Sequence, residues 1–265
     1  MKKTPKLLIL AGTVLAFLFL FGIIFYNNFI KKSIYEENSQ HLLSTYEQVD
    51  KTFTMFVQHN WNALSDWSNN LQYLDDAENM KTLWYDFARR KDAWQYQDFY
   101  MFNENCDFIT AAGRDGNAPN IQGIFLDMYE TGQPVISSYI ASDSNRRIVF
   151  ALPMDVPYTI NGITYSGLAV SYNNDVVEKL IAGNIYQGQS DCYILTSDGN
   201  VLLSLEPKTE FLQKISNLFD FLNKYTNMTE TEITDLKKNI KNVSTGSLQC
   251  LSLIHISEPT RPLYI

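Results

Sequence analysis

The stretch LLILAGTVLAFLFLFGIIFY, residues 7–26, is an unbroken apolar run around which the rest of the chain is organised. It contains about twenty residues and no charged side chain. At a rise of about 1.5 Å per residue, a helix of this length matches the roughly 30 Å hydrocarbon core of a bilayer. The run therefore predicts a transmembrane helix, which we place at residues 7–29.

A second helical pattern follows this run. Beyond a polar hinge that begins at Asn27 and Asn28, apolar residues recur every three or four positions from Leu42 to Leu74. This spacing places them on one face of a continuous helix. Such a helix would extend roughly 45–50 Å from the membrane, so we predict a spine helix over residues 30–75.

The flanks of the apolar run favour a domain outside the cell. Lysines precede the run within residues 1–6 and follow it at Lys31 and Lys32. Positive residues tend to stay on the cytoplasmic side, which favours a cytoplasmic N-terminus. No small-residue cleavage site follows the run, so we predict an uncleaved single-pass anchor in the cell membrane and an extracytoplasmic main domain.

Composition excludes two classes of protein. The chain has 265 residues, of which 45% are hydrophobic and 14% aromatic, and this composition is not that of a disordered protein. Its formal net charge is −8 and its pI is near 4.9. Because no basic stripe lies outside the flanks of the apolar run, nucleic acid is not an expected partner.

The segment after the spine helix shows the alternation of an antiparallel sheet. Hydrophobic and polar residues alternate in short runs that are separated by Gly, Pro, Asn and Asp turns. We predict a hairpin of strands 98–102 and 107–111, a loop at 113–120, a helix at 121–129, strands at 134–141, 146–154 and 163–172, and a helix at 176–182. Together these elements form a membrane-distal module, residues 76–184.

A second module begins after Gly183. The hairpin DCYIL-TSDGN-VLLS starts about 93 residues after DFYMF, which opens the first module. Either the two hairpins are an internal repeat or they share only the composition common to hairpins. With helices predicted at 211–225 and 230–240, residues 185–250 form an incomplete membrane-proximal module, and the fold class is α+β.

The last residues differ in origin from the rest. Residues 251–261, LSLIHISEPTR, are similar to the in-frame translation of a transposase adapter used in preparing sequencing libraries. We therefore predict that the native sequence stops near Cys250, that residues 251–265 are a non-native tail, and that the gene continues. An unbroken native reading frame through this segment in genomic DNA would contradict this prediction.

Three stretches carry a resemblance to a known family: VISSYIASDSNRRIVFALPM, GLAVSYNNDVVEKLI and YILTSDGNVLLSLEP. With the anchor and the long helix, they resemble the double Cache (dCache) sensor regions of bacterial transmembrane receptors over about residues 30–250. The resemblance implies two PAS-like modules on a spine helix, the second incomplete. It also implies the input domain of a sensor histidine kinase, a hybrid one included, or alternatively of a diguanylate cyclase or chemoreceptor. It further implies a homodimer and a second membrane span in the intact protein.

Patterns typical of enzymes do not occur in the sequence. It has no glycine-rich phosphate loop, no Gly-x-Ser-x-Gly, no His-Glu-x-x-His and no Gly-Gly-Asp-Glu-Phe. The three cysteines are few and scattered, and His41 and His59 lack a second ligand at helical spacing. We therefore expect no catalytic residue, no metal and no cofactor in this chain. An exported membrane-tethered enzyme and a structural or adhesion protein remain as alternatives from other classes.

The dCache resemblance implies a pocket for a small-molecule ligand in the membrane-distal module, between its sheet and the loop after the first hairpin. A small polar ligand needs convergent donors and acceptors on an apolar floor. The residues that could supply them are Tyr100, Thr110, Arg114, Ser137, Tyr139, Arg147, Tyr172 and Asn173. Arg114, between two glycines, is the predicted clamp for a carboxylate or phosphate. The amino-acid-binding members of the family have Arg-x-Trp-Tyr after this hairpin, whereas this chain has AAGRDGNAPNIQGIF, so an amino-acid ligand is not predicted.

Overall fold

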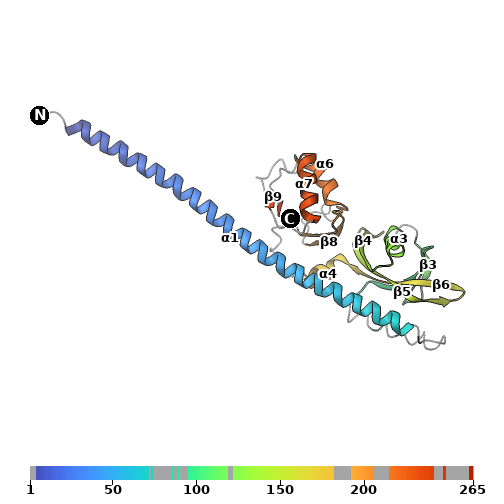
Figure 1. The fold of residues 1–265 in the computed structure, drawn as a ribbon. Helices are drawn as coiled ribbons and strands as arrows, with labels where there is room; N and C mark the ends of the chain where they lie inside the picture. The colour runs from blue at the N-terminus through green and yellow to red at the C-terminus, as the bar shows by residue number, and fades with distance from the viewer. Residues whose placement is uncertain are drawn as a thin grey trace. The chain divides into compact units, whose positions relative to one another are not determined.

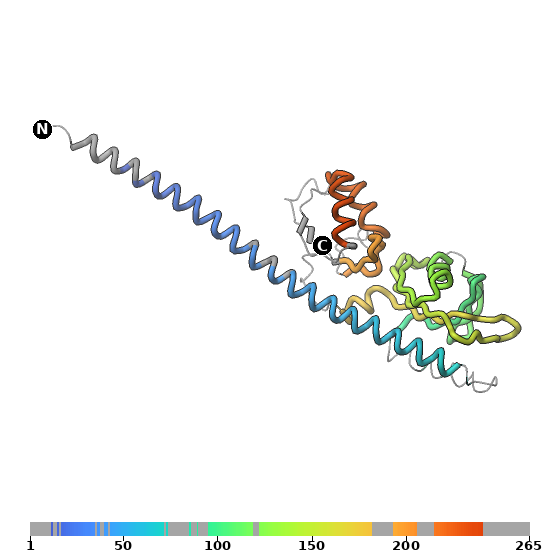
Figure 2. The backbone as a smooth tube through the Cα atoms, viewed as in Figure 1, coloured from blue at the N-terminus to red at the C-terminus, as the bar shows by residue number. Residues whose placement is uncertain are grey.

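The computed structural model describes residues 4–71, 73, 85, 89, 95–118, 122–181, 192–205, 215–241, 247–248 and 263–264. The chain divides into two compact units, Met1–Phe53 and Thr54–Ile265. Figure 1 shows the helices and strands, and Figure 2 traces the backbone in the same view. Residues 176–181 of the helix predicted at 176–182 are helical, and the helix predicted at 211–225 is helical over Leu218–Tyr225.

Helix α1 spans Thr4–Leu71 without interruption, so the predicted hinge at Asn27 and Asn28 is wrong. Asparagine lowers helix propensity by only a fraction of a kcal/mol, which the hydrogen bonds of the flanking turns offset. Further along, the Thr45 and Thr52 hydroxyls donate to the carbonyls four residues earlier, so these polar residues are also accommodated without a break.

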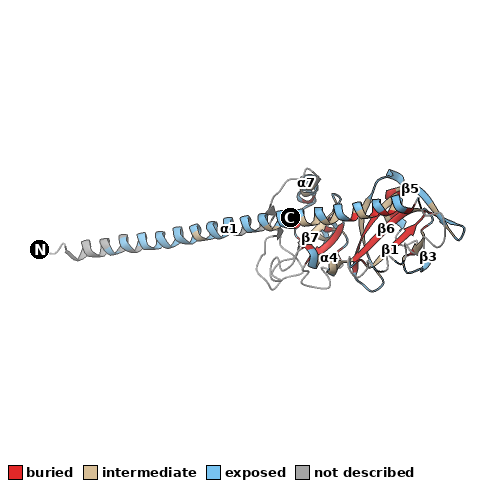
Figure 3. Cartoon of the chain, turned by 90° about the horizontal axis from the view of Figure 1, so that it is seen from below, coloured by how far each residue is buried: buried red, intermediate tan, exposed pale blue. Residues whose placement is uncertain are grey.

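The first unit exposes a long series of large apolar side chains. Between Leu15 and Tyr26 the large hydrophobic side chains are 43–76% exposed, and this part of α1 is coloured as exposed in Figure 3. The segment Phe17–Ile34 is long and apolar enough to cross a membrane, with a mean hydropathy of 1.2. An apolar surface on all sides of a helix is stable only where lipid or another protein covers it.

The second unit is built on a six-stranded antiparallel sheet. Its strand order is β3-β2-β1-β6-β5-β4. The strands are β1 (Asp98–Phe102), β2 (Asp107–Thr110), β3 (Asp115–Asn117), β4 (Val135–Ile140), β5 (Arg146–Ile160) and β6 (Ile163–Asn173). The structure therefore corrects the predicted loop at 113–120, because residues 115–117 pair with β2 as an edge strand. Three residues with two polar side chains and a glycine give too short an alternation to mark a strand.

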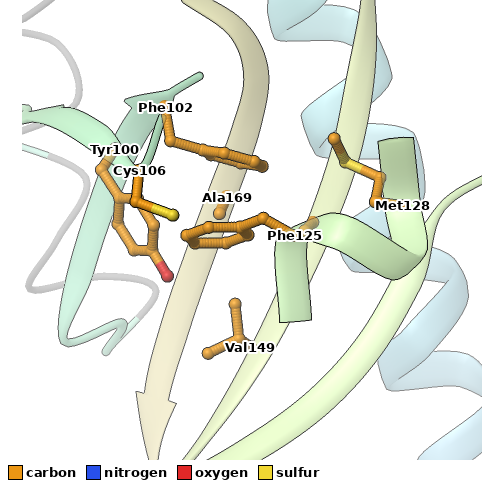
Figure 4. Close-up of a cluster of buried hydrophobic side chains, with 8 residues drawn as sticks. Tyr100, Phe102, Cys106, Phe125, Met128, Val149 and Ala169 are labelled. Atoms are coloured by element: carbon orange, nitrogen blue, oxygen red, sulfur yellow. The ribbon is translucent and has the colours of Figure 1, made fainter. Parts of the chain in front are cut away.

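Helix α3 (Gln122–Thr131) covers one face of this sheet. Phe125 and Met128 pack against Phe102, Val149 and Ala169 in a buried cluster (Figure 4). The rings of Phe102 and Phe125 stack with their centroids 3.8 Å apart. A Cβ on Gly167 would lie 2.5 Å from the Phe102 ring, so glycine is required where β6 passes under this ring.

The opposite face of the sheet packs against residues 54–71 of α1. Phe56 and Trp61 meet the Phe150 ring edge to face, with centroid distances of 5.5 and 5.4 Å. Trp67 meets Phe99 in the same way at 4.3 Å. Asn60, Leu64, Trp67 and Leu71 follow one another at three- and four-residue spacing on one face of the helix, and all four are buried.

The rest of the second unit contains the predicted second hairpin. Strands β7 (Cys192–Leu195) and β8 (Val201–Leu205) pair antiparallel, and helices α6 (Leu218–Tyr225) and α7 (Glu230–Lys241) pack on each other around Phe219 and Leu222. Helix α4 (Asn174–Ile181) connects β6 to this part. Strands β9 (Ser247–Leu248) and β10 (Leu263–Tyr264) form a separate pair, and the non-native origin of residues 251–265 stays a prediction.

Tyr129 on α3 is expected to make the folded state less stable at alkaline pH. Its hydroxyl donates to the Phe102 carbonyl at 3.3 Å and accepts from Ser166 at 3.0 Å. Burial raises the pKa of Tyr129 to about 12, although the Ser166 hydrogen bond acts in the opposite direction. The unfolded chain loses this proton near pH 10, so between about pH 10 and 12 the free energy of unfolding falls as pH rises.

The melting temperature recorded at pH 9, 10 and 11 measures this effect. The wild-type chain should lose stability across this range more steeply than Tyr129→Phe, which has no phenol to ionise. Identical slopes for the two proteins would contradict a raised pKa at this position.

Candidate functional site

The α3 face of the sheet changes from apolar to polar along its strands. Residues two apart on a strand, and residues directly opposite each other on neighbouring antiparallel strands, share a face. On β1, Phe102 and Tyr100 belong to the α3 cluster and Asp98 continues the same face. On β6, Ala169 in the cluster is followed by Ser171 on that face. The apolar residues of this face lie under α3. The polar residues occupy the next positions of the same face, toward Asp98 on β1 and toward Ser171 on β6.

The register fixes which side chains share the polar half. Arg147 on β5 lies opposite Asn173 on β6 and opposite Tyr139 on β4. Ser171 lies opposite both Asp98 and Val149, and Val149 lies opposite Ser137. Tyr100 lies opposite Thr110. We call this set the polar patch: Asp98, Tyr100, Thr110, Ser137, Tyr139, Arg147, Ser171 and Asn173.

Three buried polar atoms of the patch lack a hydrogen-bond partner among the residues that the structure describes. They are the Tyr100 hydroxyl, Nε of Arg147 and Oδ1 of Asn173. A buried polar group without a partner costs about 1–3 kcal/mol, and native proteins rarely leave several together. Nε can only donate, Oδ1 can only accept and the phenol can do either. The patch can therefore bind a small molecule that carries both a donor and an acceptor.

The pKa of Tyr100 keeps its phenol protonated. Burial raises this pKa well above its ordinary value, and the nearby Tyr139 and Asp98 raise it further, while Arg147 lowers it. For Arg147, burial lowers the pKa, but the hydrogen bonds and charges of Tyr139 and Asp143 outweigh it and raise the pKa overall. At neutral pH the patch therefore presents a neutral phenol and a guanidinium cation.

The charges around the patch are paired. Nη2 of Arg147 contacts the Asp143 carboxylate at 3.1 Å, and Nη2 of Arg114 contacts the Asp98 carboxylate at 2.7 Å. Arg114, the predicted anion clamp, is 67% exposed and held by this ion pair, and its backbone N–H donates to the Thr110 hydroxyl. Two cations balanced by two carboxylates do not favour a ligand with a large net charge.

Of the predicted site residues, the structure places Tyr172 apart from the others. Its side chain lies on the α1 face, where its hydroxyl donates to Oδ1 of the buried Asn60 at 2.8 Å. A cavity of about 10 Å³ adjoins this pair, which is enough for one water molecule and too small for a metabolite. Six of the predicted residues belong to the polar patch. Arg114 lies at the edge of the patch, where it forms the ion pair with Asp98.

Replacing Tyr172 by phenylalanine is expected to cost about 1–3 kcal/mol of unfolding free energy, because Oδ1 of Asn60 stays buried and loses its donor. Urea unfolding followed by tryptophan fluorescence measures the loss. The double variant Asn60→Leu/Tyr172→Phe removes both polar groups and should recover part of the loss. A double variant no more stable than the single one would contradict the argument.

Sequence reasoning missed two members of the polar patch, Asp98 and Ser171. Each lies two residues from a predicted residue on the same strand, Tyr100 and Asn173 respectively. Strict use of the two-residue period of a strand would have included both, and it would have excluded Tyr172.

Comparisons with known proteins bear on the fold. No family model matches the chain, and no curated protein matches it. The extracellular domain of a protein assigned as the histidine kinase mmHK1S-Z3 matches with a TM-score of 0.51 and 11% identity, over 78% of this chain and 82% of that one. The sensor domain of the Vibrio cholerae histidine kinase DctB has a TM-score of 0.47 at 12% identity, over 82% of each chain. The ligand-binding domain of the Pseudomonas aeruginosa chemoreceptor PctB with L-Gln has 0.49 at 13%, over 82% of this chain and 78% of that one.

The match to the mmHK1S-Z3 domain confirms the predicted α+β fold class. Identity at this level identifies the architecture and not the ligand. The chain therefore shares the α+β fold of this extracellular domain.

Proposed function

We propose that this chain is the extracytoplasmic input domain of a membrane-anchored sensor, and that it binds a small polar molecule at the polar patch of its membrane-distal module, residues 76–184. The observation that carries the proposal is a set of three buried atoms on neighbouring strands that have no hydrogen-bond partner in the described part of the chain: the Tyr100 hydroxyl, Nε of Arg147 and Oδ1 of Asn173. A ligand with a donor and an acceptor would satisfy atoms that otherwise destabilise the fold.

The anchor is the second part of the proposal. The apolar segment of α1 would cross the membrane with residues 1–6 in the cytoplasm, and the acidic remainder of the chain would lie outside. α1 continues from that segment to Leu71, and its last turns bury Leu64 and Leu71. A helix continuous with a span can carry a shift or rotation across the membrane. The proposed output is a histidine kinase, with a diguanylate cyclase or chemoreceptor as the alternative, and the working form is a homodimer.

A thermal-shift screen of the full chain in detergent micelles tests the binding proposal. A library of small polar metabolites at millimolar concentration should contain at least one compound that raises the melting temperature saturably. A ligand at 100 times its Kd stabilises by about 2.7 kcal/mol, or about 5–10 °C for a domain of this size.

The variants decide where the compound binds. The double variant Arg147→Gln/Asn173→Ala should lose the shift, while Thr159→Val, on an exposed part of β5, should keep it. A flat response across the library, or an equal shift in the double variant, would contradict the proposal.

A further inference from the structure

We infer that the end of β6, Tyr172-Asn173-Asn174, is a three-way junction that couples the polar patch both to α1 and to the membrane-proximal hairpin. The inference rests on the proposed function, because it gives the patch a route to the rest of the receptor. Each of the three consecutive side chains binds a different part of the second unit.

Tyr172 is the arm toward α1. Its hydroxyl donates to Oδ1 of Asn60, while Nδ2 of Asn60 donates to the Phe56 carbonyl within the helix. The Tyr172 ring also meets the Phe56 ring edge to face, with centroids 5.1 Å apart. Both polar groups are buried, so α1 cannot slide along the sheet here without leaving one of them unsatisfied.

Asn173 is the arm toward the polar patch. It lies opposite Arg147 in the β5–β6 register, and its Nδ2 donates to Oε1 of Gln97 at 2.9 Å. Its Oδ1 and Nε of Arg147 are two of the three atoms without partners. A ligand bound to either atom acts directly on the pair of strands that ends at this junction.

Asn174 is the arm toward the membrane-proximal hairpin. Its Nδ2 donates to the Ser204 carbonyl at 2.7 Å, and its Oδ1 accepts from the Ser204 N–H at 2.9 Å. The side chain therefore pairs with the backbone of β8 as a neighbouring strand would. Ser204 is 2% exposed, so water does not replace these bonds without opening the interface.

Arg146 and Arg147 repeat the arrangement on the neighbouring strand. Arg147 faces the polar patch, whereas the buried Arg146 donates to the carbonyls of Val201, at 2.7 Å, and Ile215. Ser138 on β4 donates to the same Val201 carbonyl. Asn173 and Arg147 thus lie in the patch on adjacent strands, and their chain neighbours Asn174 and Arg146 bind the backbone of β8. Consecutive residues share a peptide plane, so movement of one is passed to the other.

Hydrogen exchange of the full chain in detergent micelles tests the junction without any ligand. Asn173→Ala and, separately, Arg147→Gln disturb the patch. Each should raise the exchange rate of amides in peptides covering residues 201–205 about fivefold, and those covering 56–64 as well. In an Asn174→Ala background, Asn173→Ala should leave residues 201–205 with no further increase, while residues 56–64 still respond. In a Tyr172→Phe background, Asn173→Ala should leave residues 56–64 with no further increase, while residues 201–205 still respond.

Thr159→Val is the matched control, because Thr159 lies on β5, the strand of Arg147, but away from the junction. It should leave the exchange rates of both peptides unchanged. Unaltered exchange at 201–205 in both patch variants would overturn the inference, and so would an additive increase for Asn173→Ala in the Asn174→Ala background. An equal rise in the exchange rate of residues 148–152 would mean that the whole sheet is loosened, and it would also overturn the inference. Because no ligand is present, this outcome is independent of the metabolite screen.

Discussion

Replacing Phe102 by alanine is expected to lower the free energy of unfolding of the second unit by about 3–5 kcal/mol. The Phe102 side chain is fully buried, stacks on Phe125 and contacts Tyr129 with ring centroids 5.8 Å apart. Its ring also fills the space above Gly167, where backbone and not side chain forms the floor. A sheet backbone cannot collapse into the vacated volume, so most of the cavity remains.

Urea unfolding monitored by tryptophan fluorescence measures this loss, because Trp61 and Trp67 pack against the same sheet. Phe102→Leu keeps most of the volume and should cost less than half as much. A loss below about 1 kcal/mol for Phe102→Ala would mean that α3 does not pack as described.

Introducing two aspartates into the apolar segment of α1, as Phe21→Asp/Ile24→Asp, is expected to abolish membrane insertion. Both positions lie inside residues 7–29 and inside Phe17–Ile34, and their side chains are 65% and 60% exposed. An aspartate near the centre of a span costs about 2.5–3.5 kcal/mol, and the replaced Phe or Ile contributes a favourable 0.3–0.6 kcal/mol. The pair therefore shifts the insertion free energy by about 6–8 kcal/mol.

Alkaline carbonate extraction of membranes separates the two states. The wild-type chain and Phe21→Leu/Ile24→Leu should stay in the membrane pellet, and the aspartate pair should appear in the supernatant or in aggregates. Retention of the aspartate pair in extracted membranes would contradict a span at this segment.

The sequence predicted five of the six strands of this sheet, all except β3, because each of those five has a local signal. Strand β1 matches its predicted bounds of 98–102, and the helix expected at 121–129 appears as Gln122–Thr131. Strand β5 is longer than predicted and continues past Pro153 to Ile160, with a register shift between Pro153 and Tyr158. Proline and a register irregularity interrupt the alternation that marks a strand, so this extension has no clear local signal.

The site was less predictable, because face and burial depend on pairing. Composition singled out polar strand residues, but the alternation of faces along β6 places Asn173 in the patch and turns its neighbour Tyr172 toward α1. Arg114 looked free on a loop, and its ion pair with Asp98 depends on the folding of β2 against β1. The binding of Arg146 and Asn174 to β8 joins residues far apart in sequence, and no local pattern indicates such contacts.

The central claim is that the polar patch holds the ligand, and calorimetric titration of a compound from the metabolite screen tests it most directly. Arg147→Gln removes a charged hydrogen-bond donor, which is worth about 1.5–3 kcal/mol, so the Kd should rise roughly 10- to 150-fold. Thr159→Val should leave the Kd within about twofold of wild type, as expected for a surface change far from the site. A Kd equal to wild type in Arg147→Gln, measured on protein with an unchanged melting temperature, would contradict the claim.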